Sequence, residues 1–178
     1  MPHASSTVRQ APALDHRFSN RQLLPDRGPS LDANEHGSRI RAHRVLSASV
    51  DDVLTAWTSA PAWERWMRLR SKSRATIASC VGGAFRLEIA EGPAIHVITG
   101  EVTHLSGEQL ALTWLHHDNS ALSSRITVTV AETEYGTEML FVHDHLASRR
   151  EAAWLMRFWP TALARFGDLV SRREIRLM

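Results

Sequence analysis

The pattern of hydrophobic and polar positions divides the chain into two helical regions with a long region of strands between them. In the first region, apolar residues spaced by three and four follow Ser49, whose hydroxyl can cap a helix, with Asp52 at the third helical position. Pro61 ends this helix and begins a short second one that carries Trp63 and Trp66. The sequence therefore predicts two consecutive helices ahead of most of the strands.

Alternation with a period of two predicts the strands. A first strand is expected over residues 40–46, before the helices. Short turns rich in Gly, Asn and Asp separate the later ones, and such short connections favour an antiparallel meander because parallel pairs need long crossovers. The six later strands are expected over 73–81, 84–90, 94–104, 109–117, 123–132 and 137–146.

A long amphipathic helix is predicted at the end of the chain. It begins after Ser148, which forms a capping-box pattern with Glu151. Pro160 falls inside the pattern, where it lacks an amide donor and crowds the preceding turn, so we expect a kink or a break there. The apolar stripe of this helix consists of Ala152, Leu155, Met156, Trp159, Leu163, Phe166 and Val170.

Composition and patterning also suggest the domain limits. Residues 1–38 are rich in Pro, Gly and polar residues and lack a sustained period, which predicts a flexible tail. The folded domain is expected over 39–173, and residues 174–178 are expected to be a C-terminal tail. The hydrophobic content of 43% suits one domain with a sizeable core.

Charge, hydropathy and cysteine content limit the expected partners and location of the protein. A formal charge of +2 gives no reason to expect a nucleic-acid partner. No apolar run is long enough for a membrane helix, and the N-terminus lacks the pattern of a secretory signal, so we expect a cytoplasmic protein without a membrane span. The single cysteine, Cys80, lies in a strand-like apolar context and is expected to be a buried structural thiol.

Several segments in order give the chain a family resemblance. They are 49–66 (SVDDVLTAWTSAPAWERW), 82–86 (GGAFR), 100–102 (GEV), 110–114 (LALTW), Gly136-Thr137 followed by Met139, Phe141 and His143, and Trp159-Pro160 with Leu163. In these segments the chain resembles the activator of heat-shock-protein-90 ATPase homologue domains, within the START and polyketide-cyclase-like superfamily. The chain departs from the family pattern at Met67 and Phe158, where the family usually has an aromatic residue and a glycine.

The resemblance implies an α+β helix-grip fold. In it, an antiparallel sheet of about seven strands wraps a long C-terminal helix and leaves a cavity between them. Members of the superfamily bind hydrophobic small molecules, act as cyclases or hydrolase-like enzymes, or serve as co-chaperones. The fold alone does not choose among these functions.

Histidines are the most specific chemical feature. His143 and His145 are two residues apart on one predicted strand, so both are expected to point to the same side, and His116 can approach them from another strand. Three imidazoles could bind zinc, or His143 could act as a general acid or base. The plainer interpretation of His143 is a partly solvated histidine at the end of the strand whose hydrogen bonds are satisfied, and we predict no metal site and no cofactor.

The leading hypothesis from the sequence is the binding of a hydrophobic or aromatic small molecule between the sheet and the last helix. Two alternatives stay open: a cavity enzyme of the aromatase/cyclase or lyase type with His143 as the proton carrier, and a co-chaperone-like interaction module. A protein partner or a homodimer is compatible with each. The residues predicted to contact the ligand are Trp66, Phe85, Arg86, Trp114, His116, Met139, Phe141, His143 and Trp159.

Overall fold

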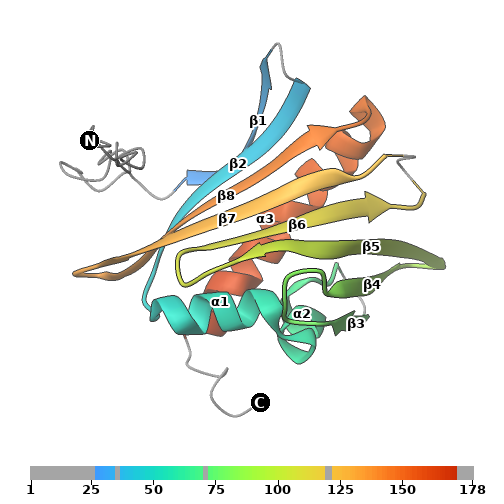
Figure 1. Ribbon diagram of the computed structural model, residues 1–178. Helices are drawn as coiled ribbons and strands as arrows, with labels where there is room; N and C mark the ends of the chain where they lie inside the picture. The colour runs from blue at the N-terminus through green and yellow to red at the C-terminus, as the bar shows by residue number, and fades with distance from the viewer. Residues whose placement is uncertain (1–26, 35–36, 70–71, 119–121, 172–178) are drawn as a thin grey trace, which may run out of the picture.

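A curved antiparallel sheet and a long helix behind it form the framework of the protein (Figure 1). The computed structural model describes residues 27–34, 37–69, 72–118 and 122–171, and for 31–34 and 37 it describes the backbone alone. The sheet order is β1-β2-β8-β7-β6-β5-β4-β3. The strands are β1 (Arg27–Asn34), β2 (Gly37–Leu46), β3 (Ser73–Ile77), β4 (Ala84–Glu91), β5 (Ala94–Leu105), β6 (Gln109–His116), β7 (Ser124–Thr133) and β8 (Gly136–Leu146).

Three helices complete the fold: α1 (Val50–Thr58), α2 (Ala60–Trp66) and α3 (Arg149–Ser171). The predicted order of elements and the helix-grip α+β fold are confirmed. Figure 1 shows α3 running across one face of the sheet, with α2 next to β3 at one edge of the sheet, while α1 contacts β7 and β8. The core is therefore the layer between this face of the sheet and the three helices.

The sheet has one strand more than the sequence predicted. The additional strand is β1, which pairs with β2 between Arg27↔His43 and Asn34↔Gly37, within the segment 1–38 that was expected to be a tail. Residues 1–26 lie outside the described residues. A strand at a sheet edge is held by backbone hydrogen bonds and needs no apolar alternation, so the periodicity of this polar segment could not indicate it.

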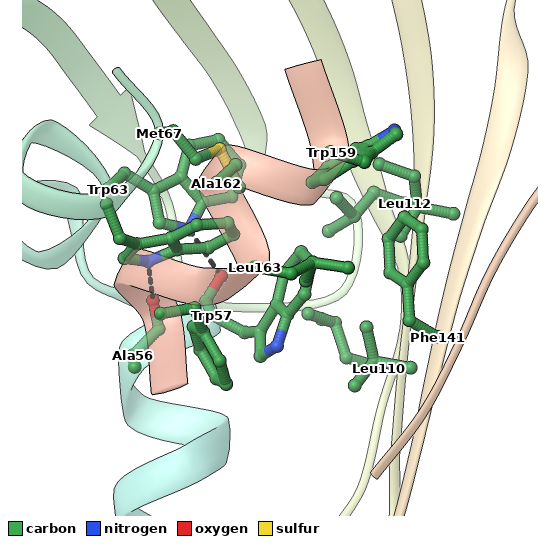
Figure 2. Packing of buried hydrophobic residues seen from close by; sticks show 14 of the residues in the cluster. Ala56, Trp57, Trp63, Met67, Leu110, Leu112, Phe141, Trp159, Ala162 and Leu163 are labelled. Atoms are coloured by element: carbon green, nitrogen blue, oxygen red, sulfur yellow. Dashed lines mark hydrogen bonds between the residues drawn. The ribbon is translucent and has the colours of Figure 1, made fainter. Parts of the chain in front are cut away.

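The first two helices form and join as the capping pattern predicts. The Ser49 hydroxyl accepts a hydrogen bond from the Asp52 amide at 3.1 Å. Two indole groups then tie α2 to α1: the Nε1–H groups of Trp63 and Trp66 donate to the carbonyl oxygens of Trp57 and Ala56 at 2.8 and 3.0 Å. Figure 2 shows such bonds as dashed lines within the buried cluster. The tryptophans of α2 therefore bury both their rings and their polar atoms.

The long helix α3 does not break at Pro160, so that part of the prediction was wrong. One helix runs from Arg149 to Ser171 with Pro160 inside it. Pro160 is exposed, while Phe158, Trp159 and Ala162 around it are fully buried. Packing of the apolar stripe on both sides of the proline offsets the loss of one backbone hydrogen bond.

The prediction of a buried Cys80 was also wrong, because β3 ends at Ile77 and the cysteine lies in the following turn, where it is exposed. The turn requires glycine at two consecutive positions. Gly82 has a φ of +80°, and a Cβ on Gly83 would come within 2.1 Å of the carbonyl oxygen of Ala78. The chain therefore turns sharply here, and Cys80 leaves the sheet before it can be covered.

Candidate functional site

The interior face of the sheet carries a layer of aromatic rings. Trp114 of β6, Phe141 of β8 and Trp159 of α3 are fully buried, and their ring centroids are 5.6 Å apart for Trp114–Trp159 and 4.5 Å apart for Phe141–Trp159. Phe85 of β4 extends the layer, 6.0 Å from Trp114. Figure 2 shows Phe141 at the strands of the sheet and Trp159 extending from α3 towards it. The predicted ligand-contacting residues that are buried here are Trp66, Phe85, Trp114, His116, Met139, Phe141, His143 and Trp159.

Arg86 is not part of this interior. It follows Phe85 on β4, and consecutive residues of a strand point to opposite faces. Its guanidinium is exposed and donates to Glu88 Oε1 from Nε at 3.0 Å and from Nη2 at 2.9 Å. The prediction that both Phe85 and Arg86 face a ligand was therefore wrong for Arg86.

His143 is fully buried, and both of its ring nitrogens are hydrogen-bonded. Nδ1 lies 3.0 Å from Nε1 of Trp159, and Nε2 lies 2.7 Å from Oγ of Ser124. An indole N–H can only donate, so Nδ1 is the acceptor and the imidazole proton is on Nε2, from which it is donated to Ser124. Burial lowers the pKa of His143 to about 3, so the ring is neutral at physiological pH.

Ser124 and Glu151 complete this polar group. The Ser124 hydroxyl accepts from His143, so its own hydrogen is free to be donated to the carbonyl oxygen of Trp114 at 3.0 Å or to Oε1 of Glu151 at 3.2 Å. Oε2 of Glu151 accepts from the amide of Ala147 at 2.8 Å. Burial raises the pKa of Glu151, while the hydrogen bonds from Ala147 and Ser124 act in the opposite direction.

Sequence reasoning did not assign Ser124 and Glu151 to the site, although a signal for each was present. Ser124 alternates with Ile126 and Val128 on the interior face of β7. Glu151 lies one turn before Leu155, in line with the apolar stripe of α3, and was assigned only a capping role. A polar residue in register with an apolar stripe is buried and needs a hydrogen-bond partner in the core. Here Ser124 and Glu151 are hydrogen-bonded to each other.

Serine, histidine and glutamate are also the components of a hydrolytic triad, but their arrangement here is different. In a triad the carboxylate accepts from Nδ1 of the histidine, which leaves Nε2 free to take the serine proton. Here Nδ1 accepts from Trp159, Nε2 carries the proton, and Glu151 contacts Ser124 instead. The geometry makes His143 a neutral hydrogen-bond donor and does not support proton transfer from serine.

The alternation predicted that His145 lies on the same side of β8 as His143, and this prediction was wrong. Its φ is +59°, and its exposed ring bonds to the neighbouring Asp144 at 2.7 Å. In the β2–β8 pairing, Ser38 faces Leu146 and Ile40 faces His143, so β8 has one extra residue in this interval. This bulge turns His145 out of the face on which His143 lies.

His116 is also fully buried, but it lies at the end of β6 with a different set of partners. Its Nε2 is 3.1 Å from Nδ1 of His96, and its ring centroid is 4.4 Å from that of Trp154. The pKa of His116 is lowered to about 4, mainly by burial and next by the neighbouring His96. Among the described residues, His116, His143 and His145 do not converge on one point as the zinc alternative required.

Two buried indole N–H groups have no hydrogen-bond partner among the described residues: Nε1 of Trp57 and Nε1 of Trp114. Trp114 lies within the aromatic layer, with its ring centroid 5.7 Å from His143. By contrast, the indole N–H groups of Trp63, Trp66 and Trp159 are all bonded. The interior thus presents an unused donor surrounded by apolar walls.

Comparison with known proteins assigns the family. Residues 47–171 match the family described as "Activator of Hsp90 ATPase homolog 1-like protein". The chain belongs to this family. The predicted resemblance is confirmed, and both departures of this family member, Met67 and Phe158, are fully buried parts of its core. No curated protein matches the sequence.

Solved structures share the fold of this family member. A crystal structure of a Chromobacterium violaceum protein is 25% identical, with a TM-score of 0.65 over 75% of this chain and 96% of the other. CalU16 from Micromonospora echinospora is 19% identical, with a TM-score of 0.59 over 85% and 89%. A Nitrosomonas europaea protein is 15% identical, with a TM-score of 0.64 over 76% and 96%.

None of the helices in the part of the chain that the structure describes combines the length and the apolar character needed to cross a membrane. The cytoplasmic location and the open alternatives of a homodimer or a protein partner stay predictions.

Proposed function

We propose that this family member binds a neutral, hydrophobic small molecule that carries a hydrogen-bond acceptor, in the interior between the sheet and α3. The observation that carries the proposal is the Nε1–H of Trp114, which is buried without a partner in the aromatic layer. A carbonyl or ether oxygen of a ligand would accept from it. Family membership supports the same general role, the holding of a hydrophobic ligand.

An unpaired donor in an apolar interior is costly. Leaving a buried polar group without a hydrogen bond destabilises a protein by about 1–3 kcal/mol, so such groups usually have a partner. The Trp114 ring is held by Trp159 and Phe85, which fixes the position of the indole N–H. A bound acceptor would remove this cost, and the gain appears as affinity for molecules that bring one.

The charges of the site favour a neutral ligand over an anionic one. The one cation among the predicted site residues, Arg86, lies on the outer face and is paired with Glu88. His143 is neutral because of its lowered pKa, and Glu151 adds a carboxyl group on the same side. A buried anion without a cation to pair with it would be strongly disfavoured. The ligand is therefore an apolar, preferably aromatic compound with an oxygen acceptor.

The same observations count against the alternative of a cavity enzyme that uses His143 to carry protons. A general acid or base works best when its pKa lies near the working pH. The pKa of His143 lies far below neutrality, and Nδ1 is occupied by Trp159. His143 and Ser124 therefore act as a fixed polar wall that holds Trp159 in place beside the ligand.

The test uses the full chain with prodan, a neutral naphthalene dye that carries a ketone. Native mass spectrometry of the purified protein shows whether a molecule is retained, and the emission of prodan measures its affinity. Trp114→Phe keeps an aromatic ring and removes the donor, so we expect prodan to bind about fivefold more weakly. The matched control is Trp63→Phe, because the N–H of Trp63 is already used by Trp57. Its prodan affinity is expected to be that of the unmodified protein.

Two results would overturn the proposal. One is a protein that retains no molecule and does not bind prodan. The other is a Trp114→Phe variant that is folded by circular dichroism and binds prodan as tightly as the unmodified chain.

A further inference from the structure

We propose that His96, His116 and Asp118 form a binding site for a divalent transition-metal ion such as Zn²⁺. This site is separate from the Trp114 donor and does not depend on the proposed ligand. The three residues come from β5, from the end of β6 and from the turn that follows β6. Their donor atoms all lie within 4.8 Å of one another.

The separations of the three donor atoms fit one metal ion. Nδ1 of His96 is 3.1 Å from Nε2 of His116 and 3.6 Å from Oδ2 of Asp118, and the latter two atoms are 3.9 Å apart. Three atoms with these separations lie on a circle with a radius of about 2.1 Å, the usual length of a zinc–nitrogen or zinc–oxygen bond. A metal ion can therefore reach all three donors without a change in the backbone.

A neighbouring carboxylate prepares His96 for this role. Oε2 of Glu91 lies 2.8 Å from Nε2 of His96 and accepts its proton, so Nδ1 is left with its lone pair directed to the other side of the ring. Carboxylates in this position orient metal-binding histidines in many sites and increase their basicity. The ring of Trp154 lies against both imidazoles, with centroids 5.1 Å from His96 and 4.4 Å from His116.

The chemistry and exposure of the site indicate the class of ion. Two imidazoles and one carboxylate suit Zn²⁺ and its neighbours better than Mg²⁺ or Ca²⁺, which prefer oxygen ligands. The Asp118 side chain is 54% exposed while His116 is fully buried, so the site lies at the rim of the interior. A fourth position for water is then open on the solvent side, as in zinc sites with three protein ligands.

The competing explanation is a hydrogen bond in which His116 Nε2–H donates to Nδ1 of His96, with Asp118 nearby by chance. Both arrangements use Nε2 of His116 and Nδ1 of His96. Only the metal site predicts that the affinity for Zn²⁺ depends on all three residues. Metal titration of matched variants therefore separates the two explanations.

The experiment is calorimetric titration of the chelator-treated full chain with ZnCl₂, together with the visible spectrum of the Co²⁺ form. We expect one ion per chain in this site and Co²⁺ bands typical of a four-coordinate ion with nitrogen and oxygen ligands. Asp118→Asn is expected to weaken Zn²⁺ binding at least tenfold and His96→Ala at least a hundredfold, while Glu91→Gln costs about tenfold. His104→Ala is the matched control, because His104 is an exposed histidine on the same strand.

The chain has ten histidines, so loss of binding has to be specific to the site. Unchanged affinity in His104→Ala with weakened binding in Asp118→Asn supports the site. The proposal is overturned if the unmodified chain binds no Zn²⁺, or if Asp118→Asn and His96→Ala bind it as tightly as the unmodified chain. Asp118 is exposed, so its variant gives a readout even if changes at the buried His116 prevent folding.

Discussion

The two buried histidines, His143 and His116, differ in what they contact. Both are fully buried, and burial lowers the pKa of both. His143 uses both nitrogens inside the core, on Trp159 and Ser124. His116 lies at the rim, where one nitrogen faces His96 and an exposed Asp118. Equal burial therefore does not mean equal function. His143 is a structural hydrogen-bonding residue, whereas His116 has neighbours with which it could bind one ion.

The largest effect is expected from removing the ring of His143. His143→Ala leaves the Trp159 N–H without its acceptor and Ser124 without its donor, and it opens a cavity in the core. We expect the free energy of unfolding to fall by about 2–4 kcal/mol, measured by urea denaturation. The control is His145→Ala, two residues away and exposed, with an expected change within about 0.5 kcal/mol. Similar losses for both variants would contradict the structural role of His143.

Acid should weaken the protein through the same residue. The unfolded chain takes up a proton on His143 below pH 6.5, whereas the folded protein does not until about pH 3. The contribution of His143 to the free energy of unfolding is therefore fully present above pH 6.5. It falls as the pH is lowered towards 3, by at most about 1.4 kcal/mol per pH unit. His116 acts in the same direction. The raised pKa of Glu151 has the opposite effect: above its ordinary pKa of 4.5, this group lowers the free energy of unfolding as the pH rises.

The measurement for this prediction is the free energy of unfolding between pH 7 and 4 for the unmodified chain and for His143→Gln. Glutamine offers a donor and an acceptor but does not titrate, so the slope should be smaller in the variant. Equal slopes would show that His143 is not the group that responds to acid.

A smaller difference is expected between two tryptophans that differ in the use of their N–H groups. Trp63→Phe removes a hydrogen bond to Trp57 and should cost about 1 kcal/mol more in the free energy of unfolding than Trp114→Phe, whose N–H has no partner. Thermal or urea unfolding without added ligand checks this difference. A larger loss in Trp114→Phe would show that its N–H is already satisfied.

The smallest effect is expected at the rim. Asp118→Asn in the metal-free protein should change the free energy of unfolding by less than about 0.5 kcal/mol, because Asp118 is an exposed turn residue. With Zn²⁺ present, the unmodified chain should gain thermal stability and the variant should gain less, since binding to the folded state alone is stabilising. Equal gains in both proteins would contradict a role of Asp118 in metal binding.

Local patterns of the sequence predicted the elements, because caps and periodicity act over a few residues. Ser49, Ser148 and the alternating strands could be assigned in this way, and so could the interior positions of Trp114 and Phe141, whereas His143 was expected to be partly solvated and is fully buried. The same local rules failed at His145, where a bulge in β8 interrupts the alternation, and at Cys80, where the strand ends early. They also failed at Pro160, where packing holds the helix together.

By itself, the sequence determined the family, the order of the helices and of the strands from β2 onward, and most of the apolar residues of the core, since these depend on spacing along the chain. The tertiary structure alone decided which polar groups meet. It brings Ser124 and Glu151 to His143 from two different elements, and it brings His96 and Asp118 to His116. The physical reason is that hydrogen bonding and metal ligation require contacts of a few ångströms between residues far apart in sequence. Periodicity carries no information about such contacts.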